Sequence, residues 1–280
     1  MSLPLFARVG KRSWAVIGGG DDVFHSYGAN QGFVLGEEAS LVYDTGFHNQ
    51  AASQILRRIR KKDAGIIIIN SHYHSDHVFG NSIFSEKGAP IISHDKCSRA
   101  MRSKSEKMLD SYRNRDTRIS RLLQGVQVAY PTITYRTNLT VHLGSDLNAS
   151  ILYAGTQAHT KGDSILHFPA DGIVFAGDVL WVGYHPNLED ADIQGQIQAL
   201  RLILRMKPRR IVPGHGPVAS PKDVKRSVKY LEQLDRNIGS GIRKGLKGDD
   251  FVRYAIPRWS WGWKMQWLME SYLRQLFRKD

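Results

Sequence analysis

The stretch Ser71-His72-Tyr73-His74-Ser75-Asp76-His77-Val78 decides how the rest of this chain is interpreted. It places three imidazoles and one carboxylate within six positions, and zinc, iron and manganese accept both kinds of ligand. In an extended chain, residues two apart point to the same side, so His72 and His74 can bind one ion. A turn after them lets Asp76 and His77 face a second ion. The pattern therefore predicts a site for two divalent cations.

The residues before this stretch support a functional site over a histidine-rich surface turn. An apolar run from Gly65 to Ile69 has the length and composition of a buried strand, and Asn70 and Ser71 end it. A surface turn would place no such demand on the residues that precede it. We therefore expect a strand to deliver the histidines to the end of a sheet.

Three further polar residues follow apolar runs later in the chain, each in a segment that contains glycine. His159 lies in Gly155-Thr-Gln-Ala-His159, Asp178 ends Val174-Phe-Ala-Gly-Asp178, and His215 lies in Val212-Pro-Gly-His215. Glycine lets the backbone approach a site closely, and catalytic side chains often project from such turns. These three residues are therefore candidate partners of the early histidine cluster.

Length and cysteine content limit the class of protein. A chain of 280 residues is within reach of one large α/β domain, and we expect residues 1–280 to form a single domain. The single cysteine, Cys97, rules out an internal disulfide and a zinc site built from cysteines. Histidine, aspartate and glutamate remain as metal ligands.

The net charge of +13 comes from 39 Lys and Arg against 26 Asp and Glu. Such an excess can attract nucleic acid, anionic substrates or acidic partners. The basic residues are spread over the predicted helices and do not alternate with aromatics as in a base-stacking surface. A solvated basic surface with a small-molecule substrate is favoured, and nucleic acid stays open without being favoured.

The early charges Arg8 and Lys11 argue against a signal peptide, and no apolar run reaches membrane length. We therefore expect a cytoplasmic protein without membrane contact.

Apolar patterning predicts alternating strands and helices, with the second half of the chain repeating the order of the first. The predicted strands are 33–35, 41–43, 66–69, 90–93, 139–143, 150–153, 164–168, 173–175 and 210–212. The predicted helices are 49–62, 193–206, 221–238 and 265–276. This repetition indicates an internal duplication and two packed sheets with helices outside.

Two segments fall outside this alternation. Residues 96–123 are highly charged, and we expect a helical insertion that forms either a lid or a plain surface helix pair. Residues 221–280 form a helical C-terminal extension of the same domain. Within it, the tryptophan-rich segment 259–267 could line a pocket, cover a dimer interface or dock the C-terminus onto the core; docking is favoured because large aromatics are usually core residues, and a homodimer stays open.

Taken together, these landmarks resemble those of the metallo-β-lactamase superfamily over residues 30–217. The resemblance rests on His72-x-His74-x-Asp76-His77, then His159, Asp178 and His215, with Asp44 in a Val-Tyr-Asp-Thr-Gly turn. It implies an αββα sandwich of two mixed β-sheets flanked by helices, with metals at the edge between the sheets. It also implies that His72, His74 and His159 hold one metal, that Asp76, His77 and His215 hold the other, and that Asp178 bridges them.

The same resemblance implies a metal-dependent hydrolase in which a hydroxide bridges two ions, zinc first, with iron or manganese as alternatives. Asp76 would orient this hydroxide towards a small ester, thioester, lactone or amide. True β-lactamases carry Cys or Ser in place of Asp178, so the general hydrolases and glyoxalase II-like members are the better match. Two alternatives remain: a phosphodiesterase or nuclease, and a mononuclear iron dioxygenase acting on sulfur.

Three residues are candidates for supporting roles. Asp44 could accept a hydrogen bond from a metal-bound imidazole, although capping the following helix is an equally good role. Tyr184 or His185 could protonate the leaving group. A lone histidine before proline is more often a turn residue, so the assignment of His185 is the weaker one.

Overall fold

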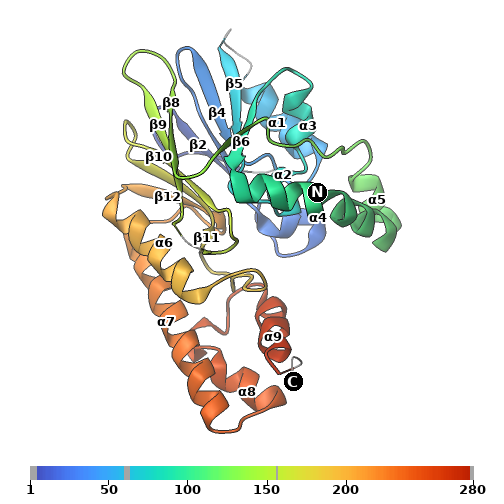
Figure 1. The fold of residues 1–280 in the computed structure, drawn as a ribbon, viewed down its shortest axis with the longest axis vertical. Helices are drawn as coiled ribbons and strands as arrows, with labels where there is room; N and C mark the ends of the chain where they lie inside the picture. The colour runs from blue at the N-terminus through green and yellow to red at the C-terminus, as the bar shows by residue number, and fades with distance from the viewer. Residues whose placement is uncertain (1–4, 60–63, 156, 278–280) are drawn as a thin grey trace.

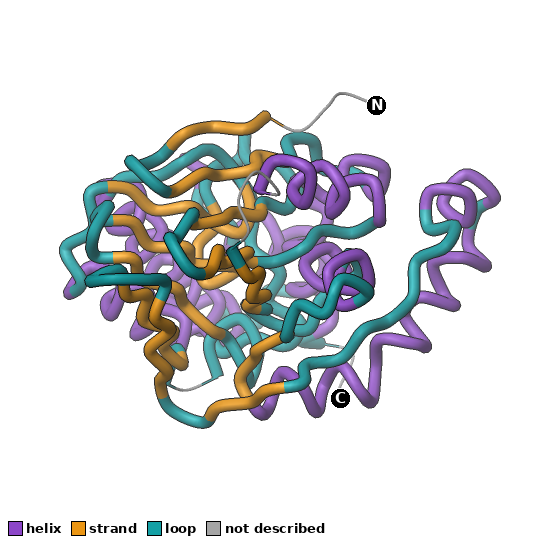
Figure 2. Tube along the Cα trace, turned by 90° about the horizontal axis from the view of Figure 1, so that it is seen from above, coloured by secondary structure: helices purple, strands orange, loops and turns teal. Residues whose placement is uncertain are grey.

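Two β-sheets pack face to face at the centre of the molecule, and helices cover their outer faces (Figures 1 and 2). The structure, a computed structural model, describes residues 5–59, 64–155 and 157–277. The first half of the chain forms one sheet and the second half forms the other. This arrangement is the two packed sheets that the sequence pattern predicted and the αββα sandwich that the resemblance implied.

The first sheet has seven strands in sequence order, antiparallel from β1 to β4 and parallel from β4 to β7. Its strands are β1 (Leu5–Arg8), β2 (Ser13–Ile17), β3 (Gln31–Val34), β4 (Ala39–Tyr43), β5 (Gly65–Ile69), β6 (Ile91–His94) and β7 (Ile133–Tyr135). The second sheet has five strands in the order β12-β11-β10-β9-β8, and only β11 and β12 pair in parallel. These are β8 (Asn138–His142), β9 (Asn148–Tyr153), β10 (Ser164–Phe168), β11 (Ile173–Trp181) and β12 (Arg210–His215). Both sheets are therefore mixed.

Alternation along the strands explains why each sheet has two buried faces. In β4, Leu41 and Tyr43 belong to the core between the sheets, whereas Val42 belongs to the core under the helices. Successive side chains of a strand point to opposite faces, so one strand serves both cores. From the other sheet, Leu166 and Phe175 fill the space between the sheets. The sandwich is thus held by apolar burial on four faces.

Helices cover the outer faces, as the apolar stripes predicted. Beside the first sheet lie α1 (Asn49–Ile59), α2 (Ser75–Val78) and α3 (Asn81–Ser85), and beside the second lie α6 (Ile193–Arg205) and α7 (Pro221–Arg243). The start of α7 has a clear local cause: Ser220 and Asp223 form a capping box around Pro221 at the first turn. The predicted helix 49–62 is confirmed as far as Ile59, and residues 60–62 lie outside the described residues.

The segment 96–123 is helical, as predicted, and connects β6 to β7. It forms α4 (Asp95–Arg115) and α5 (Thr117–Leu122), which extend to one side of the strands (Figure 1). The few apolar residues of α4, among them Met101 and Leu109, pack with Phe79 in a separate small core. The helices are therefore anchored on the turn that carries the histidine cluster, and their action as a lid stays a prediction.

The tryptophan-rich segment is divided between docking and exposure. It precedes α9 (Gln266–Gln275), and α8 (Gly248–Ala255) lies before it. Trp263 packs against Tyr230 of α7, with ring centroids 4.8 Å apart, which is the docking that the sequence favoured. Trp261 and Trp267 remain 50% and 55% exposed. Within the described residues, none of the helices has the length and apolar character needed to cross a bilayer.

Three strands of the first sheet were not predicted, and a strand of the second sheet is longer than predicted. β1 and β7 are short and partly exposed, so they lack a continuous apolar pattern. β2 is largely buried, and its apolar run over residues 14–17 is too short to distinguish a strand from a buried turn. The predicted strand 173–175 continues to Trp181 through an irregular register at Gly177, whose φ is +51°. Asp178 therefore lies within β11, and not in a turn after a strand as the sequence indicated.

Candidate metal centre

All seven predicted ligands come together at one edge of the sandwich, in two adjacent clusters. Each cluster offers nitrogen or oxygen atoms that lie within 4.8 Å of one another. The first cluster consists of His72, His74, His159 and Asp178, and the second of Asp76, His77 and His215. They arrive from the segments after β5 and β9, from within β11 and from the end of β12. The structure thus brings together residues that are scattered over much of the sequence.

A sharp change of backbone direction separates the ligands of the early motif. His74 is extended, with φ −65° and ψ 147°, and α2 begins at the next residue, Ser75. His72 and His74 therefore lie on the extended side, whereas Asp76 and His77 lie in the helical turn. This is the turn that the spacing of the motif predicted.

In the first cluster, three ring nitrogens face one another. His74 Nδ1 lies 3.0 Å from His72 Nε2 and 2.9 Å from His159 Nε2. The second nitrogen of His159 donates to the carbonyl of Asn187 at 3.1 Å. The second nitrogen of His72 lies 2.9 Å from Ser71 Oγ, which itself donates to Asp44. The Nε2 atoms of both rings are therefore lone-pair acceptors, and converging lone pairs are what a cation requires.

In the second cluster, two imidazoles point an unpartnered nitrogen at the same place. His77 Nδ1 donates to Asp44 at 2.8 Å, and His215 Nδ1 donates to the carbonyl of Tyr27 at 2.9 Å. Their Nε2 atoms are buried, and none of the described residues forms a hydrogen bond with them. Asp76 Oδ2 lies 3.7 Å from one and 3.6 Å from the other. Buried polar atoms without partners are rare in proteins, and a bound metal would satisfy both.

Asp178 lies between the two clusters, and its two oxygens face different ones. Oδ1 is 3.1 Å from His77 Nε2 and 3.3 Å from His215 Nε2, whereas Oδ2 is 3.3 Å from His159 Nε2. The space for this carboxylate depends on Gly214, because a Cβ there would lie 1.9 Å from Asp178 Oδ1. The position fits the bridging role expected of Asp178, which stays a prediction.

Burial and charge set the protonation of the ligands. Burial lowers the pKa of His72 well below its usual value and that of His159 to about 3, so both are neutral. Burial also acts to lower the pKa of His77, but the carboxylates of Asp178, Asp76 and Asp44 raise it well above the usual value. For Asp178, burial favours the protonated acid, yet the surrounding imidazoles hold its pKa well below the ordinary range. His72 and His159 of the first cluster therefore offer neutral imidazoles, and an ionised carboxylate stands between the clusters.

Asp44 supports the centre from behind. Its carboxylate accepts hydrogen bonds from the backbone N–H of Ser71 at 2.7 Å, from Ser71 Oγ at 2.6 Å and from His77. The backbone of Asp44 is left-handed, with φ +59°, which aspartate tolerates better than most residues. The next helix, α1, begins only at Asn49, so the alternative role of helix cap does not apply.

Tyr184 packs beside a candidate ligand, with its ring centroid 5.9 Å from that of His215, whereas His185 lies in the C-terminal docking region. The Tyr184 hydroxyl donates to the carbonyl of Gly20 at 2.6 Å. His185 Nδ1 lies 2.8 Å from the Tyr230 hydroxyl, and its ring packs against Trp263 in the C-terminal docking region. Neither residue lines the cavity described below. Proton donation by either residue stays a prediction.

Two residues that the sequence did not single out position His215. The ring of Trp181 stacks on that of His215, with centroids 3.8 Å apart and planes 11° apart, and Trp181 Nε1 donates to the carbonyl of Asp178. Asn30 Nδ2 donates to the carbonyls of Pro213 and Gly216 on either side of His215. A tryptophan after an apolar run and an asparagine before a strand carry no distinctive signal, so neither role could be found without the structure.

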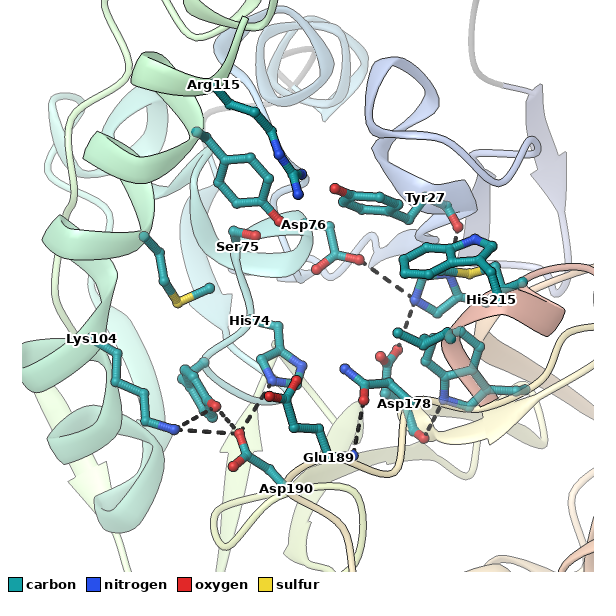
Figure 3. Close-up of a pocket in the computed structure, with 18 residues that line it drawn as sticks. Tyr27, His74, Ser75, Asp76, Lys104, Arg115, Asp178, Glu189, Asp190 and His215 are labelled. Carbon is teal, nitrogen blue, oxygen red and sulfur yellow. Dashed lines mark hydrogen bonds and ion pairs between the residues drawn. The ribbon is translucent and has the colours of Figure 1, made fainter. Parts of the chain in front are cut away.

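A cavity of about 440 Å³ opens onto the two clusters (Figure 3). Its walls come from the ligand-bearing turn, from α4, from the loop before α6 and from the start of α9. The residues that line it, besides the clustered ligands His74, Asp76, Asp178 and His215, are Tyr27, Tyr73, Ser75, Lys104, Met108, Tyr112, Arg115, Trp181, Asn187, Glu189, Asp190, Met265, Trp267 and Leu268. The volume suits a small molecule.

Comparison with known families agrees with this geometry. The family model described as "Metallo-beta-lactamase superfamily" matches residues 27–215, a range that includes all seven clustered residues. The chain belongs to the metallo-beta-lactamase superfamily. No curated protein sequence matches this superfamily member significantly.

Several solved structures resemble this superfamily member over most of their length. A metallo-beta-lactamase from Pontibacter korlensis has a TM-score of 0.66 and 18% identity, covering 82% of this chain and 99% of its own. DIM-1 metallo-beta-lactamase exposed to ceftazidime gives 0.65 and 14%, covering 82% and 97%. VMB-1 gives 0.65 and 15%, covering 83% and 98%. At such low identity the likeness shows the shared fold alone.

Proposed function

We propose that this chain is a metal-dependent hydrolase with a binuclear centre that cleaves a small ester, thioester, lactone or amide. The observation that carries the proposal is the convergence of ring nitrogens on two adjacent points, with Asp178 between them. Superfamily membership supports it, because members are generally metal-dependent hydrolases. Zinc is the metal that we expect first, since imidazole and carboxylate suit it.

The side chains of the two clusters suit two ions, divided as the resemblance implies. His72, His74 and His159 would hold the first ion, Asp76, His77 and His215 the second, and Asp178 both. When bound, such ions supply Lewis-acid chemistry and lower the pKa of a coordinated water towards about 7.

Side chains of the cavity would orient the attacking water and partly exclude bulk water. Asp76 lines the cavity with a side chain that is 12% exposed, so its carboxylate can orient an attacking water and accept its proton. Trp181 and Tyr27 form an aromatic wall next to His215. Where such a wall excludes water, the local dielectric constant is lower, and this strengthens the electrostatic interactions of the reacting groups. A β-lactam is not the favoured substrate, because Asp178 stands where true β-lactamases carry Cys or Ser.

A substrate panel with a metal-depleted control tests this function. The purified protein would be assayed against esters, thioesters, lactones, lactams and phosphodiesters, before and after chelation and with zinc restored. We expect cleavage of an acyl compound that is lost on chelation, recovered with zinc and absent in His74→Ala. Activity that survives complete metal removal would contradict the proposal.

Two outcomes would replace this function with another. Cleavage restricted to phosphodiesters, with retention on nucleic acid that weakens with salt, would identify a nuclease. A single iron per chain without hydrolysis would identify a mononuclear iron enzyme. A cytoplasmic location stays a prediction from the sequence, and a homodimer stays open.

A further inference from the structure

One face of α4 forms a wall of the cavity. Lys104, Met108, Tyr112 and Arg115 line it, spaced four, four and three residues apart along the helix. Residues three and four apart lie on the same side of a helix, so these side chains form one stripe. The helix therefore presents a cation near each end of the stripe to the space above the metal clusters.

The two cations differ in their partners. Lys104 Nζ lies 3.3 Å from Asp190 Oδ2 and donates to the Tyr73 hydroxyl at 2.8 Å, so its charge is already paired. Arg115 makes no hydrogen bond or ion pair with any of the described residues, although its side chain lines the cavity. Figure 3 shows its guanidinium pointing inward, towards Tyr27 and Asp76.

Arg113 and Arg118 at the same corner have partners, whereas Arg102 and Arg121, like Arg115, form no hydrogen bond or ion pair with the described residues; of these five arginines, only Arg115 lines the cavity. Arg113 donates to the carbonyls of Leu123 and Val126, and Arg118 pairs with Asp116 at 2.9 Å. Both therefore help to fix the corner between α4 and α5. The same corner holds Arg115 at the rim of the cavity, where no contact with the described residues uses its charge.

The local chemistry indicates what would pair with Arg115. A guanidinium offers five donors in a planar fork that matches a carboxylate or a phosphate. Asp76 belongs to the second cluster, and its Oδ2 faces His77 and His215. Met265, Trp267 and Leu268 provide an apolar wall that suits the uncharged body of a substrate. A ligand with an apolar body and an anionic group could contact this wall and pair its anionic group with the Arg115 guanidinium.

We propose that Arg115 determines specificity by binding an anionic group of the substrate, a carboxylate or a phosphate. The inference rests on the proposed hydrolase function and narrows its substrates to charged acyl compounds. Because Arg115 is exposed, its attraction for an anion weakens as ionic strength rises.

Matched substrates and matched variants test the proposal. The substrates are p-nitrophenyl esters of glutarate whose distal carboxylate is free, methylated or replaced by a phosphonate. The variants are Arg115→Ala, Arg115→Lys and the control Lys107→Ala, which removes one exposed charge from the same helix outside the cavity lining. A second readout is calorimetric titration of the purified proteins with glutarate and with its uncharged diamide, which needs no turnover.

We expect Arg115→Ala to raise KM for the anionic esters and weaken glutarate binding by about ten- to a hundred-fold, as for hydrogen bonds to charged groups. The methyl ester, the diamide and kcat should change little, and Arg115→Lys should recover part of the loss. Whichever ester, carboxylate or phosphonate, has the higher kcat/KM indicates which anionic group the cavity prefers. Equal effects of Arg115→Ala and Lys107→Ala, or equal loss for charged and uncharged ligands, would overturn the proposal. Failure of the hydrolase function is distinct, because esters would then stay intact while glutarate binding still reported on Arg115.

Discussion

The carboxylate of Asp44 holds the ring of His77 from the side opposite its free nitrogen, at 2.8 Å, and both side chains are fully buried. This contact fixes the proton on His77 Nδ1 and leaves Nε2 to face Asp178. Partners of this kind orient metal-bound imidazoles and raise their basicity. We therefore expect Asp44 to act as a positioning residue for the second cluster.

Asp44→Asn should weaken metal binding at the second cluster by about ten- to a hundred-fold, because an amide group replaces one acceptor oxygen with a donor. Asparagine tolerates the left-handed backbone, so the fold should persist. Competition with a metal indicator would measure the change. Asp171→Asn is the matched control, since Asp171 is also buried and accepts from Lys11, Arg12 and Ser13. It should lower stability without altering metal affinity; equal metal affinity in Asp44→Asn and the wild type would contradict the role of Asp44.

Trp181→Ala should reduce both stability and metal binding, because the ring stacked on His215 is lost. Truncation of a buried tryptophan costs about 3–5 kcal/mol. Trp181→Phe keeps an aromatic ring and should retain more of both properties. Urea denaturation combined with metal titration of the folded protein would separate the two effects. If Trp181→Ala bound both metals as tightly as the wild type, the ring would serve packing alone.

Acidification should release metal from the second cluster before the first. The pKa of His77 is raised by its carboxylate neighbours against the effect of burial, so protons compete for His77 at a higher pH than for an ordinary histidine. Burial lowers the pKa of His72 and takes that of His159 to about 3, so protons compete there only in stronger acid. Metal content measured after equilibration at stepwise lower pH would reveal two stages. A single stage, or release of both ions in alkali, would show that these groups do not govern affinity.

Asp178→Asn should leave one metal tightly held where the wild type holds two, because a neutral amide cannot bridge two cations as a carboxylate does. The four imidazoles around it then keep their positions with less neutralising charge. Elemental analysis of the variant would give the number of metal ions that it binds. Two ions retained after dialysis against a chelator would exclude a bridging role.

Local patterns in the sequence predicted two packed sheets and singled out the clustered residues, and the family resemblance added the αββα sandwich and the division of the ligands. His72, His74, Asp76 and His77 share one short motif, and β5 before it is a simple apolar run. The roles of Asn30 and Trp181 depend on contacts between segments far apart in the chain, and no local pattern encodes them. The surroundings of His185 were equally hidden in the sequence, because this histidine packs against Tyr230 and Trp263 of distant segments.

The weakly patterned strands were missed for a related reason. β1 and β7 are short edge strands that gain their order from one neighbour each. Several of their side chains are exposed, so the strands do not require an alternating apolar pattern.

The sequence predicts Asp178 after a strand because Gly177 interrupts the apolar run. In the structure, the irregular register at Gly177 keeps Asp178 inside β11 and turns its carboxylate towards the clusters.

The most direct test of the account is the number of metal ions per folded chain, measured by elemental mass spectrometry on protein purified without added chelator. If the seven clustered side chains form a binuclear centre, we expect two divalent ions per chain, with zinc first, and a loss of ions when His74 or His77 is replaced by alanine. A chain that binds no metal stoichiometrically, or one iron that survives the His77 replacement, would contradict it.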